Sequence, residues 1–282
     1  MTRAIRFNLV DVFTETAFAG NQLAVFTDAR GLSDAQMQAL AAEMGFSEST
    51  FVLPAEAGGD ARIRIFTPTR ELAFAGHPVL GSAWVLAGPM QLGVITLETG
   101  SGLVPVVLGR EGAKIMYAAM TQPIPTVRPF EREAELLAAL GVTGSELPVE
   151  VYDNGIEHVY VALPSTEAVV ALQPDFAALL ELTDAGANCF FADGATVTTR
   201  MFAPADGVAE DAATGSAAGP FALHLVRHGV VGWGERVTIS QGASLGRPST
   251  LYATAHGSAE GGVTAVEVGG SAVVVGRGEI AV

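Results

Sequence analysis

The chain has little cysteine and little positive charge, and no long apolar run. A single cysteine, Cys189, stands among 282 residues, which excludes an intrachain disulfide and a cysteine-rich zinc site. Lysine and arginine number 15 against 30 acidic residues, a formal net charge of −15. This charge repels phosphate backbones and anionic membrane surfaces, so we expect binding to neither nucleic acid nor membrane. No apolar run reaches the roughly 20 residues that a membrane-spanning helix needs.

Two further absences, of nucleotide-binding motifs and of an apolar stretch in the first residues, reduce the number of possible functions. The sequence contains neither GxGxxG nor a P-loop motif, so we expect no nucleotide cofactor and predict that the protein works without any cofactor. Its first residues contain no apolar stretch of the kind found in a secretory signal, and we expect a cytoplasmic protein. What the chain does have is 49% hydrophobic residues over its 282 positions, enough for about two well-filled domains.

The sequence repeats itself at about half its length. RIFTP at 64–68 and RMFAP at 200–204 lie 136 residues apart, and HPVLGSA at 77–83 resembles DAATGSA at 211–217 with an offset of 134. The second pair shares Gly-Ser-Ala but begins with histidine in one copy and aspartate in the other. A duplication of this size predicts two similar domains with unlike reactive groups at equivalent turns, and an active site in the cleft between the domains.

Strands and helices are predicted to alternate in each half. Ser33 and Gln36 form a capping box, and Gly45 ends the helix that they begin. The apolar residues of this helix recur at the spacing of one buried face: Met37, Leu40, Ala41 and Met44. Further strands are predicted at 7–13, 22–26, 51–53, 61–66, 158–163 and 197–202, and helices just after 77–78, at 131–140, at 175–182 and after 214.

The domain boundaries follow from turn residues. Three prolines between residues 122 and 130 favour a linker. We therefore expect an N-terminal domain over 1–122 and a C-terminal domain over 130–262. Two Gly-Gly pairs among alternating valines predict a β-hairpin in the tail, at 263–282, and spacing does not assign it to either domain.

The two matched turns are the first candidates for a site. Free N–H groups where a helix begins bind anions without lysine or arginine. A carboxylate held by Gly76, His77, Gly215 and Ser216 is the functional interpretation, and caps with close packing are the structural one. GSAAG at 215–219 is not the GxSxG elbow of a hydrolase, because its serine directly follows the first glycine.

Glu48 is the next candidate. It lies in FSESTF at 46–51, after a predicted helix and before a strand, with phenylalanines on both sides. Aromatic neighbours that exclude water would raise the pKa of this carboxyl group, which suits proton transfer near pH 7. The structural alternative is a glutamate in a solvent-facing turn.

Other polar residues carry weaker signals. His224 and His228 stand four apart on a predicted helix, as zinc ligands can, but no third ligand is apparent and we predict no metal site. His158 and His256 belong to no constellation of catalytic or metal-binding residues in the sequence and are assigned structural roles. Cys189 is interpreted as a small buried hydrophobic residue.

Together these motifs resemble the PhzF-like family of phenazine biosynthesis. The resemblance runs in order through nearly the whole chain, over VDVF at 10–13, FAGN at 18–21, FSESTF at 46–51, FTP at 66–68, FAGHP at 74–78 and EDAATGSA at 210–217. It implies a fold similar to diaminopimelate epimerase, of the α/β (α+β) class. Each of its two domains would wrap a mostly antiparallel sheet around a central helix. It also implies a homodimer.

The resemblance further implies isomerase chemistry of the type carried out on trans-2,3-dihydro-3-hydroxyanthranilate. By motif, the general acid–base role falls on Glu48, while His77, Asp211 and Ser216 position the substrate and assist proton transfer. A single cysteine excludes a racemase with two thiols. Two alternatives stay open: an amino- or hydroxy-acid epimerase that uses Glu48 with His77 as the opposing base, and a non-catalytic protein that binds carboxylates.

Overall fold

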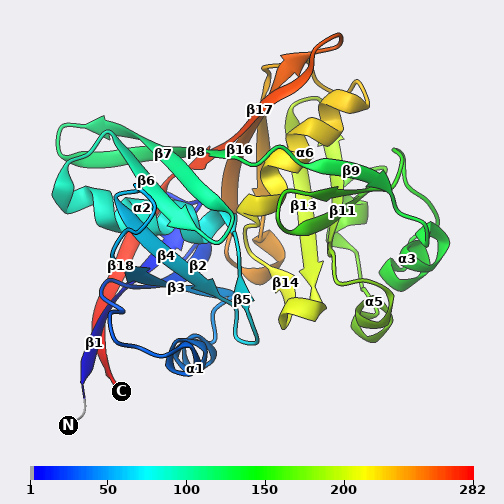
Figure 1. The fold of residues 1–282 in the computed structure, drawn as a ribbon. Coiled ribbons are helices and arrows are strands. Elements are labelled where there is room, and N and C mark those ends of the chain that lie inside the picture. Colours follow the sequence, from blue (N-terminus) through cyan, green and yellow to red (C-terminus); the bar gives the residue numbers. More distant parts are fainter. Residues whose placement is uncertain (1–2) are drawn as a thin grey trace. The chain divides into compact units, whose positions relative to one another are not determined.

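A computed structural model describes residues 3–282 of the chain, which forms two compact units (Figure 1). Unit 1 comprises Met1–Thr121 with Gly269–Val282, and unit 2 comprises Gln122–Val268. The C-terminal strand therefore belongs with the N-terminal residues. Among the described residues, no helix is both long and apolar enough to span a membrane.

Unit 1 is one sheet with two helices. Its strands are β1 (Ala4–Val12), β2 (Asn21–Phe26), β3 (Glu48–Leu53), β4 (Ala61–Phe66), β5 (Glu71–Leu72), β6 (Val94–Thr99), β7 (Gly102–Glu111), β8 (Lys114–Gln122) and β18 (Ala272–Ala281), and its helices are α1 (Asp34–Met44) and α2 (Gly76–Met90). Hydrogen bonding joins them in the order β18–β1–β2–β3–β4–β6–β7–β8, with β5 as a short partner of β4. The pairs β2–β3 and β4–β6 are parallel, and the others are antiparallel.

Helix α1 follows the sequence prediction. Ser33 caps it in a capping box with Gln36, and Gly45 ends it in the left-handed conformation at φ 65°. The face that carries Met37 and Leu40 is buried against a cluster of aromatic residues in which Phe51 takes part. The helix therefore covers one face of the sheet of unit 1.

Helix α2 differs from its prediction in start and length. It begins at Gly76 and runs for fifteen residues, whereas the sequence predicted a short helix just after Pro78. Pro78 is tolerated in the first turn because the N–H groups there have no helical acceptor. Most of α2 is buried, and Ser82 on it pairs with Thr50 of β3, with 2.8 Å between their hydroxyl oxygens.

Unit 2 repeats this arrangement. Its strands are β9 (Thr126–Pro129), β10 (Glu150–Asp153), β11 (Glu157–Ala162), β12 (Gly186–Asp193), β13 (Thr196–Ala203), β14 (Val208–Asp211), β15 (Arg236–Gln241), β16 (Ser249–Ser258) and most of β17 (Gly262–Gly270). Its helices are α3 (Glu133–Leu140), α4 (Thr166–Val170), α5 (Phe176–Leu182) and α6 (Gly215–Arg227), with short 3₁₀ turns η1 (Pro204–Asp206) and η2 (Ala243–Leu245). The predicted linker at 122–130 contains β9, which pairs with β10.

The duplication is visible in the strand pairings. Unit 2 is ordered β9–β10–β11–β12–β13–β15–β16, with β14 as a short partner of β13. Its parallel pairs are β11–β12 and β13–β15, which correspond to β2–β3 and β4–β6 of unit 1. The predicted fold of two similar α+β halves is confirmed.

One interaction is repeated almost atom for atom. Arg64 binds Glu71 through two nitrogens and lies over the Phe66 ring at 5.1 Å. Arg200 binds Glu210 in the same way and lies over the Phe202 ring at 5.0 Å. Arg64 thus links β4 to the short strand β5, and Arg200 links β13 to the short strand β14.

The predicted equivalence of His77 and Asp211 is wrong. The offset between the units is 136 at the arginines, but 139 at the paired glutamates and at the helix starts, Gly76 and Gly215. The connection that contains η1 adds three residues in unit 2. His77 therefore corresponds to Ser216, since each is the second residue of its helix, and Asp211 ends β14.

Candidate active site

In unit 1, Glu48 and His77 lie side by side. Glu48 begins β3, and His77 is the second residue of α2. The distance from Glu48 Oε2 to His77 Nε2 is 3.6 Å, and the two side chains are 16% and 3% exposed. The Glu48 side chain is thus partly exposed, although its Oε2 is buried, and the imidazole beside it is closed to solvent.

A short polar chain holds the other side of the His77 ring. Ser47 Oγ donates to Asn21 Oδ1 at 3.0 Å, and Asn21 Nδ2 lies 3.3 Å from His77 Nδ1. Burial lowers the pKa of His77 to about 3, because the charged ring would lose its hydration. The imidazole is therefore neutral near pH 7.

The surroundings of Glu48 differ from those that the sequence suggested. Residues three apart in a strand point to opposite faces, and Phe51 packs with Phe26 in the cluster under α1. Thr50, two residues from Glu48, instead meets Ser82 of α2. Glu48 thus shares a face with the central helix, not with the aromatic cluster.

In unit 2, hydrogen bonds fix the loop between β14 and α6. Thr214 Oγ1 donates to Asp211 Oδ2 at 2.7 Å. Gln241 of β15 donates to the Asp211 carbonyl at 2.9 Å and accepts from the Thr214 N–H at 3.1 Å. This holds Asp211, which is only 8% exposed, at the entrance to α6.

Side chains also support the first turn of α6. Gln122 Nε2 donates to the Gly215 carbonyl at 2.8 Å, and Asn154 Nδ2 donates to the Ser216 carbonyl at 2.9 Å. The Ser216 carbonyl would normally accept from the N–H four residues on, but that residue is Pro220, which has none. Asn154 supplies the missing donor. A proline inside a predicted helix was the signal that could have pointed to such a partner.

His158 also belongs to this half, although no feature of the sequence indicated a place for it in the site. Its Nε2 lies 3.0 Å from Ser216 Oγ. The two residues are 58 positions apart in the chain, so only the fold brings them together. His158 therefore has more than the structural role assigned to it from the sequence, because it contacts a predicted site residue.

Both central helices begin without a side-chain cap. The residue before α2 is Ala75 and the residue before α6 is Thr214, and neither side chain bonds to the first turn of its helix. The helix dipole places partial positive charge at such starts, which favours anions. Gly76 and Gly215 therefore open two turns that suit a carboxylate.

The structure supplies a third partner for His224 and His228. Glu150 Oε2 lies 2.9 Å from His228 Nε2 and 3.5 Å from His224 Nδ1, and the three donor atoms lie within 4.8 Å of one another. Among the described residues, this group could supply three metal ligands. The Glu150 carboxylate already accepts from Tyr152 at 2.9 Å and from Arg227 at 3.2 Å, whereas His224 Nε2 is buried without a hydrogen-bond partner among the described residues.

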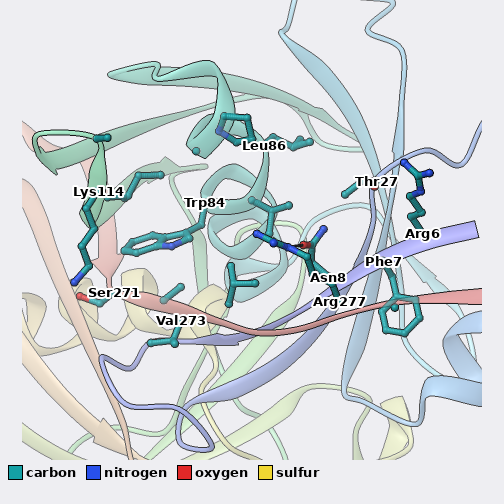
Figure 2. A pocket seen from close by; sticks show the side chains of 18 of the residues that line it. Arg6, Phe7, Asn8, Thr27, Trp84, Leu86, Lys114, Ser271, Val273 and Arg277 are labelled. Atoms are coloured by element: carbon teal, nitrogen blue, oxygen red, sulfur yellow. Dashed lines mark hydrogen bonds between the residues drawn. The ribbon is translucent and has the colours of Figure 1, made fainter.

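Unit 1 also contains a cavity of about 1260 Å³ (Figure 2). Lys114 and the nearby Trp84 lie at one end of its lining and Arg6 at the other. Arg6 pairs with Glu279 at 3.1 Å, and both side chains are largely exposed. None of the predicted site residues of unit 1 lines this cavity, which therefore lies apart from the Glu48 and His77 pair.

Sequence comparison assigns the family. The phenazine biosynthesis-like protein family matches residues 10–278. The chain belongs to this family. It is 50% identical over 273 residues to a trans-2,3-dihydro-3-hydroxyanthranilate isomerase of Pseudomonas aeruginosa, a match that covers 97% of this chain and 98% of its relative. The predicted resemblance is confirmed, and the protein is an isomerase of the phenazine biosynthesis-like family.

Two solved structures share this fold. A predicted epimerase from Pseudomonas aeruginosa is 34% identical, with a TM-score of 0.81 over 98% of this chain and 99% of its own. A Bacillus anthracis phenazine biosynthesis protein of the PhzF family has a TM-score of 0.86 over 99% of both chains. Its identity is 23%, so that likeness concerns the fold alone.

Proposed function

We propose that the chain is a cofactor-independent isomerase that moves a proton on a small, unsaturated, cyclic carboxylate. The substrate is trans-2,3-dihydro-3-hydroxyanthranilate or a close analogue. The observation that carries this proposal is the 50% identity, over almost the full length, to an isomerase named for that compound. The pair formed by Glu48 and His77 supplies the groups that such a reaction needs.

Glu48 is the proposed general acid and base. Its carboxylate takes a proton from a ring carbon, and the electron pair of the broken C–H bond moves into the conjugated system. The protonated Glu48 then returns the proton to a different ring carbon, so the double bonds shift and no atom is gained or lost. This chemistry needs side-chain groups only, and it contributes about 10²- to 10⁴-fold to the rate.

His77 is proposed to hold Glu48 in place as a neutral group. Asn21 Nδ2 lies 3.3 Å from Nδ1, the ring also hydrogen-bonds to the backbone of Gln22, and Ser47 donates to Asn21, so these contacts fix the orientation of the ring. His77 Nε2 then faces Glu48 Oε2 at 3.6 Å. With a pKa of about 3, His77 steadies the carboxylate without adding a full positive charge beside it.

Asp211 and Ser216 are proposed to bind and orient the substrate. Asp211 is held by Thr214 and is suited to the amino group of an aminated ring. Ser216 and the N–H group at Gly215 are suited to its carboxylate. Binding through these groups supplies the positioning that acid–base catalysis alone does not provide.

The geometry favours this isomerase over the epimerase in which Glu48 and His77 act from opposite sides of one carbon. Reacting atoms approach to about 3–3.5 Å, so two bases on opposite sides of a carbon stand roughly 6–7 Å apart. Glu48 Oε2 and His77 Nε2 are 3.6 Å apart, too close for a carbon between them. The two residues are better suited to one shared face.

The test is a proton NMR time course in D₂O with trans-2,3-dihydro-3-hydroxyanthranilate and with amino and hydroxy acids. We expect the ring compound to lose one C–H signal while its olefinic signals move. Inversion of an amino-acid centre without movement of a double bond would support the epimerase. Binding of carboxylates with no exchange at all would support the non-catalytic alternative.

We also propose that the protein is a homodimer. Leu103 and Val107 point outward from β7 and are 51% and 56% exposed, and Val94, paired with Val107, is 50% exposed. Large exposed patches of this kind mark contact surfaces. Light scattering after gel filtration should give twice the chain mass of 29.0 kDa. A Val107→Glu variant should give the mass of a single chain.

A further inference from the structure

Ser216 and His158 form a buried pair within unit 2. His158 lies on β11 and is fully buried, and Ser216 is 5% exposed at the start of α6. The distance from His158 Nε2 to Ser216 Oγ is 3.0 Å, which is a hydrogen bond. The direction of this bond decides what the Ser216 hydroxyl can do, because one of its two partners must donate.

The other ring nitrogen indicates the direction. Among the described residues, His158 Nδ1 has no hydrogen-bond partner. A Cβ placed on Gly186 would lie 3.1 Å from Nδ1 and 2.4 Å from Met201 Cε, so carbon-bound hydrogens pack around this nitrogen. A C–H group fits against a lone pair, as a weak donor, but not against an N–H. The proton therefore belongs on Nε2, which donates to Ser216 Oγ.

This arrangement differs from the serine–histidine pair of a hydrolase. In that pair the histidine accepts the proton of the serine and becomes charged. Burial lowers the pKa of His158 to about 3, and among the described residues no carboxylate binds Nδ1 to stabilise a cation. His158 can therefore orient Ser216 but cannot activate it as a nucleophile.

We propose that His158 is a positioning residue that makes Ser216 a hydrogen-bond donor to the substrate carboxylate. Since Ser216 Oγ accepts from His158, its own hydrogen is directed elsewhere, at the start of α6 where the helix dipole favours an anion. Asn154 supports the same residue through its carbonyl. The identity of the substrate in this proposal rests on the proposed function. The state of the His158–Ser216 pair does not depend on it.

Ligand binding tests the proposal with two probes. Anthranilate carries a carboxylate on an aminated ring, and anthranilamide has a neutral amide in its place. We expect His158→Leu and Ser216→Ala each to raise the calorimetric Kd for anthranilate about tenfold, the usual effect of one lost hydrogen bond to a charged group. The Kd for anthranilamide should change far less. His158→Gln, whose amide can still donate, should stay within about threefold of the wild type.

The double variant separates positioning from general damage. If His158 acts through Ser216, His158→Leu combined with Ser216→Ala binds anthranilate no more weakly than either single variant. Effects that multiply, an equal loss for both probes, or a wild type without preference for anthranilate would overturn the proposal. If His158→Leu does not fold, the comparison of His158→Gln with Ser216→Ala gives the same answer.

An NMR experiment on the ligand-free protein is independent of the substrate. Long-range ¹⁵N–¹H spectra of the histidine side chains should show the His158 proton on Nε2 throughout the neutral pH range. A proton on Nδ1 would overturn the proposal. A failure of the proposed function would instead appear as absence of isomerisation, with the NMR result and the preference for anthranilate unchanged.

Discussion

Asn154 donates to the Ser216 carbonyl, replacing the helical N–H that Pro220 lacks. The bond is 2.9 Å long and buried. It shows how the turn that carries Ser216 is stabilised: a proline removes one helical bond near the start of α6, and a side chain from outside the helix restores it. In this turn the N–H groups of Ala217 and Ala218 bond to the Thr214 carbonyl, so those of Gly215 and Ser216 are the ones that a ligand could use.

We expect Asn154→Ala to lower the free energy of unfolding by about 1–3 kcal/mol, because the Ser216 carbonyl is then buried without a donor. Pro220→Ala supplies an N–H at the missing position. In the double variant this N–H should compensate for much of the loss caused by Asn154→Ala. Urea unfolding of the four proteins measures the coupling, and strictly additive effects would show that the two residues do not share the Ser216 carbonyl.

The buried histidines make stability depend on pH. Burial depresses the pKa of both His77 and His158 to about 3, below the value near 6.5 of an unfolded chain. The unfolded state therefore binds protons first. Their contribution is fully present above pH 6.5 and is lost as pH falls toward 3, by about 1.4 kcal/mol per pH unit for each histidine.

The contribution of one histidine can be isolated by difference. In denaturant titrations between pH 7 and pH 4.5, His158→Gln should reduce the slope of unfolding free energy against pH relative to the wild type. The slope due to carboxylates is common to both proteins and cancels. Equal slopes in the two proteins would mean that His158 does not have a depressed pKa in the folded state.

The two equivalent ion pairs, Arg64 with Glu71 and Arg200 with Glu210, offer a matched pair of variants. The Glu210 side chain is 10% exposed, whereas the Glu71 side chain is 41% exposed, and each binds its arginine through two bonds. Breaking a buried pair leaves a charge without compensation, while exposed pairs are worth about 0–1 kcal/mol. We expect Glu210→Gln to lower the melting temperature clearly more than Glu71→Gln does. The reverse order would contradict the assigned burial.

The sequence predicted the duplication, and helix α1 with its caps, because these depend on local spacing and on residues close in the chain. It misplaced the equivalence of the two turns. Unit 2 has three extra residues around η1, between the two matching motifs. The shared Gly-Ser-Ala sequence does not show that Gly81 lies inside α2 whereas Gly215 begins α6.

The partners of the site residues could not be predicted, since they come from distant parts of the chain. Asn21 reaches His77 across 56 positions, and His158 reaches Ser216 across 58. The phenylalanines beside Glu48 were a misleading local signal, because strand geometry turns Phe51 to the other face. The roles of Glu48, His77, Asp211 and Ser216 stay predictions that experiment must test.

The most direct test of the central claim is proton exchange in Glu48→Gln. The amide keeps the size of the side chain but cannot carry a proton between carbons. We predict that deuterium incorporation from D₂O into trans-2,3-dihydro-3-hydroxyanthranilate, followed by NMR, falls at least about 10²-fold while substrate binding changes little. Glu43→Gln, at an exposed position on α1, should keep wild-type exchange. Exchange at the wild-type rate in Glu48→Gln would contradict the account.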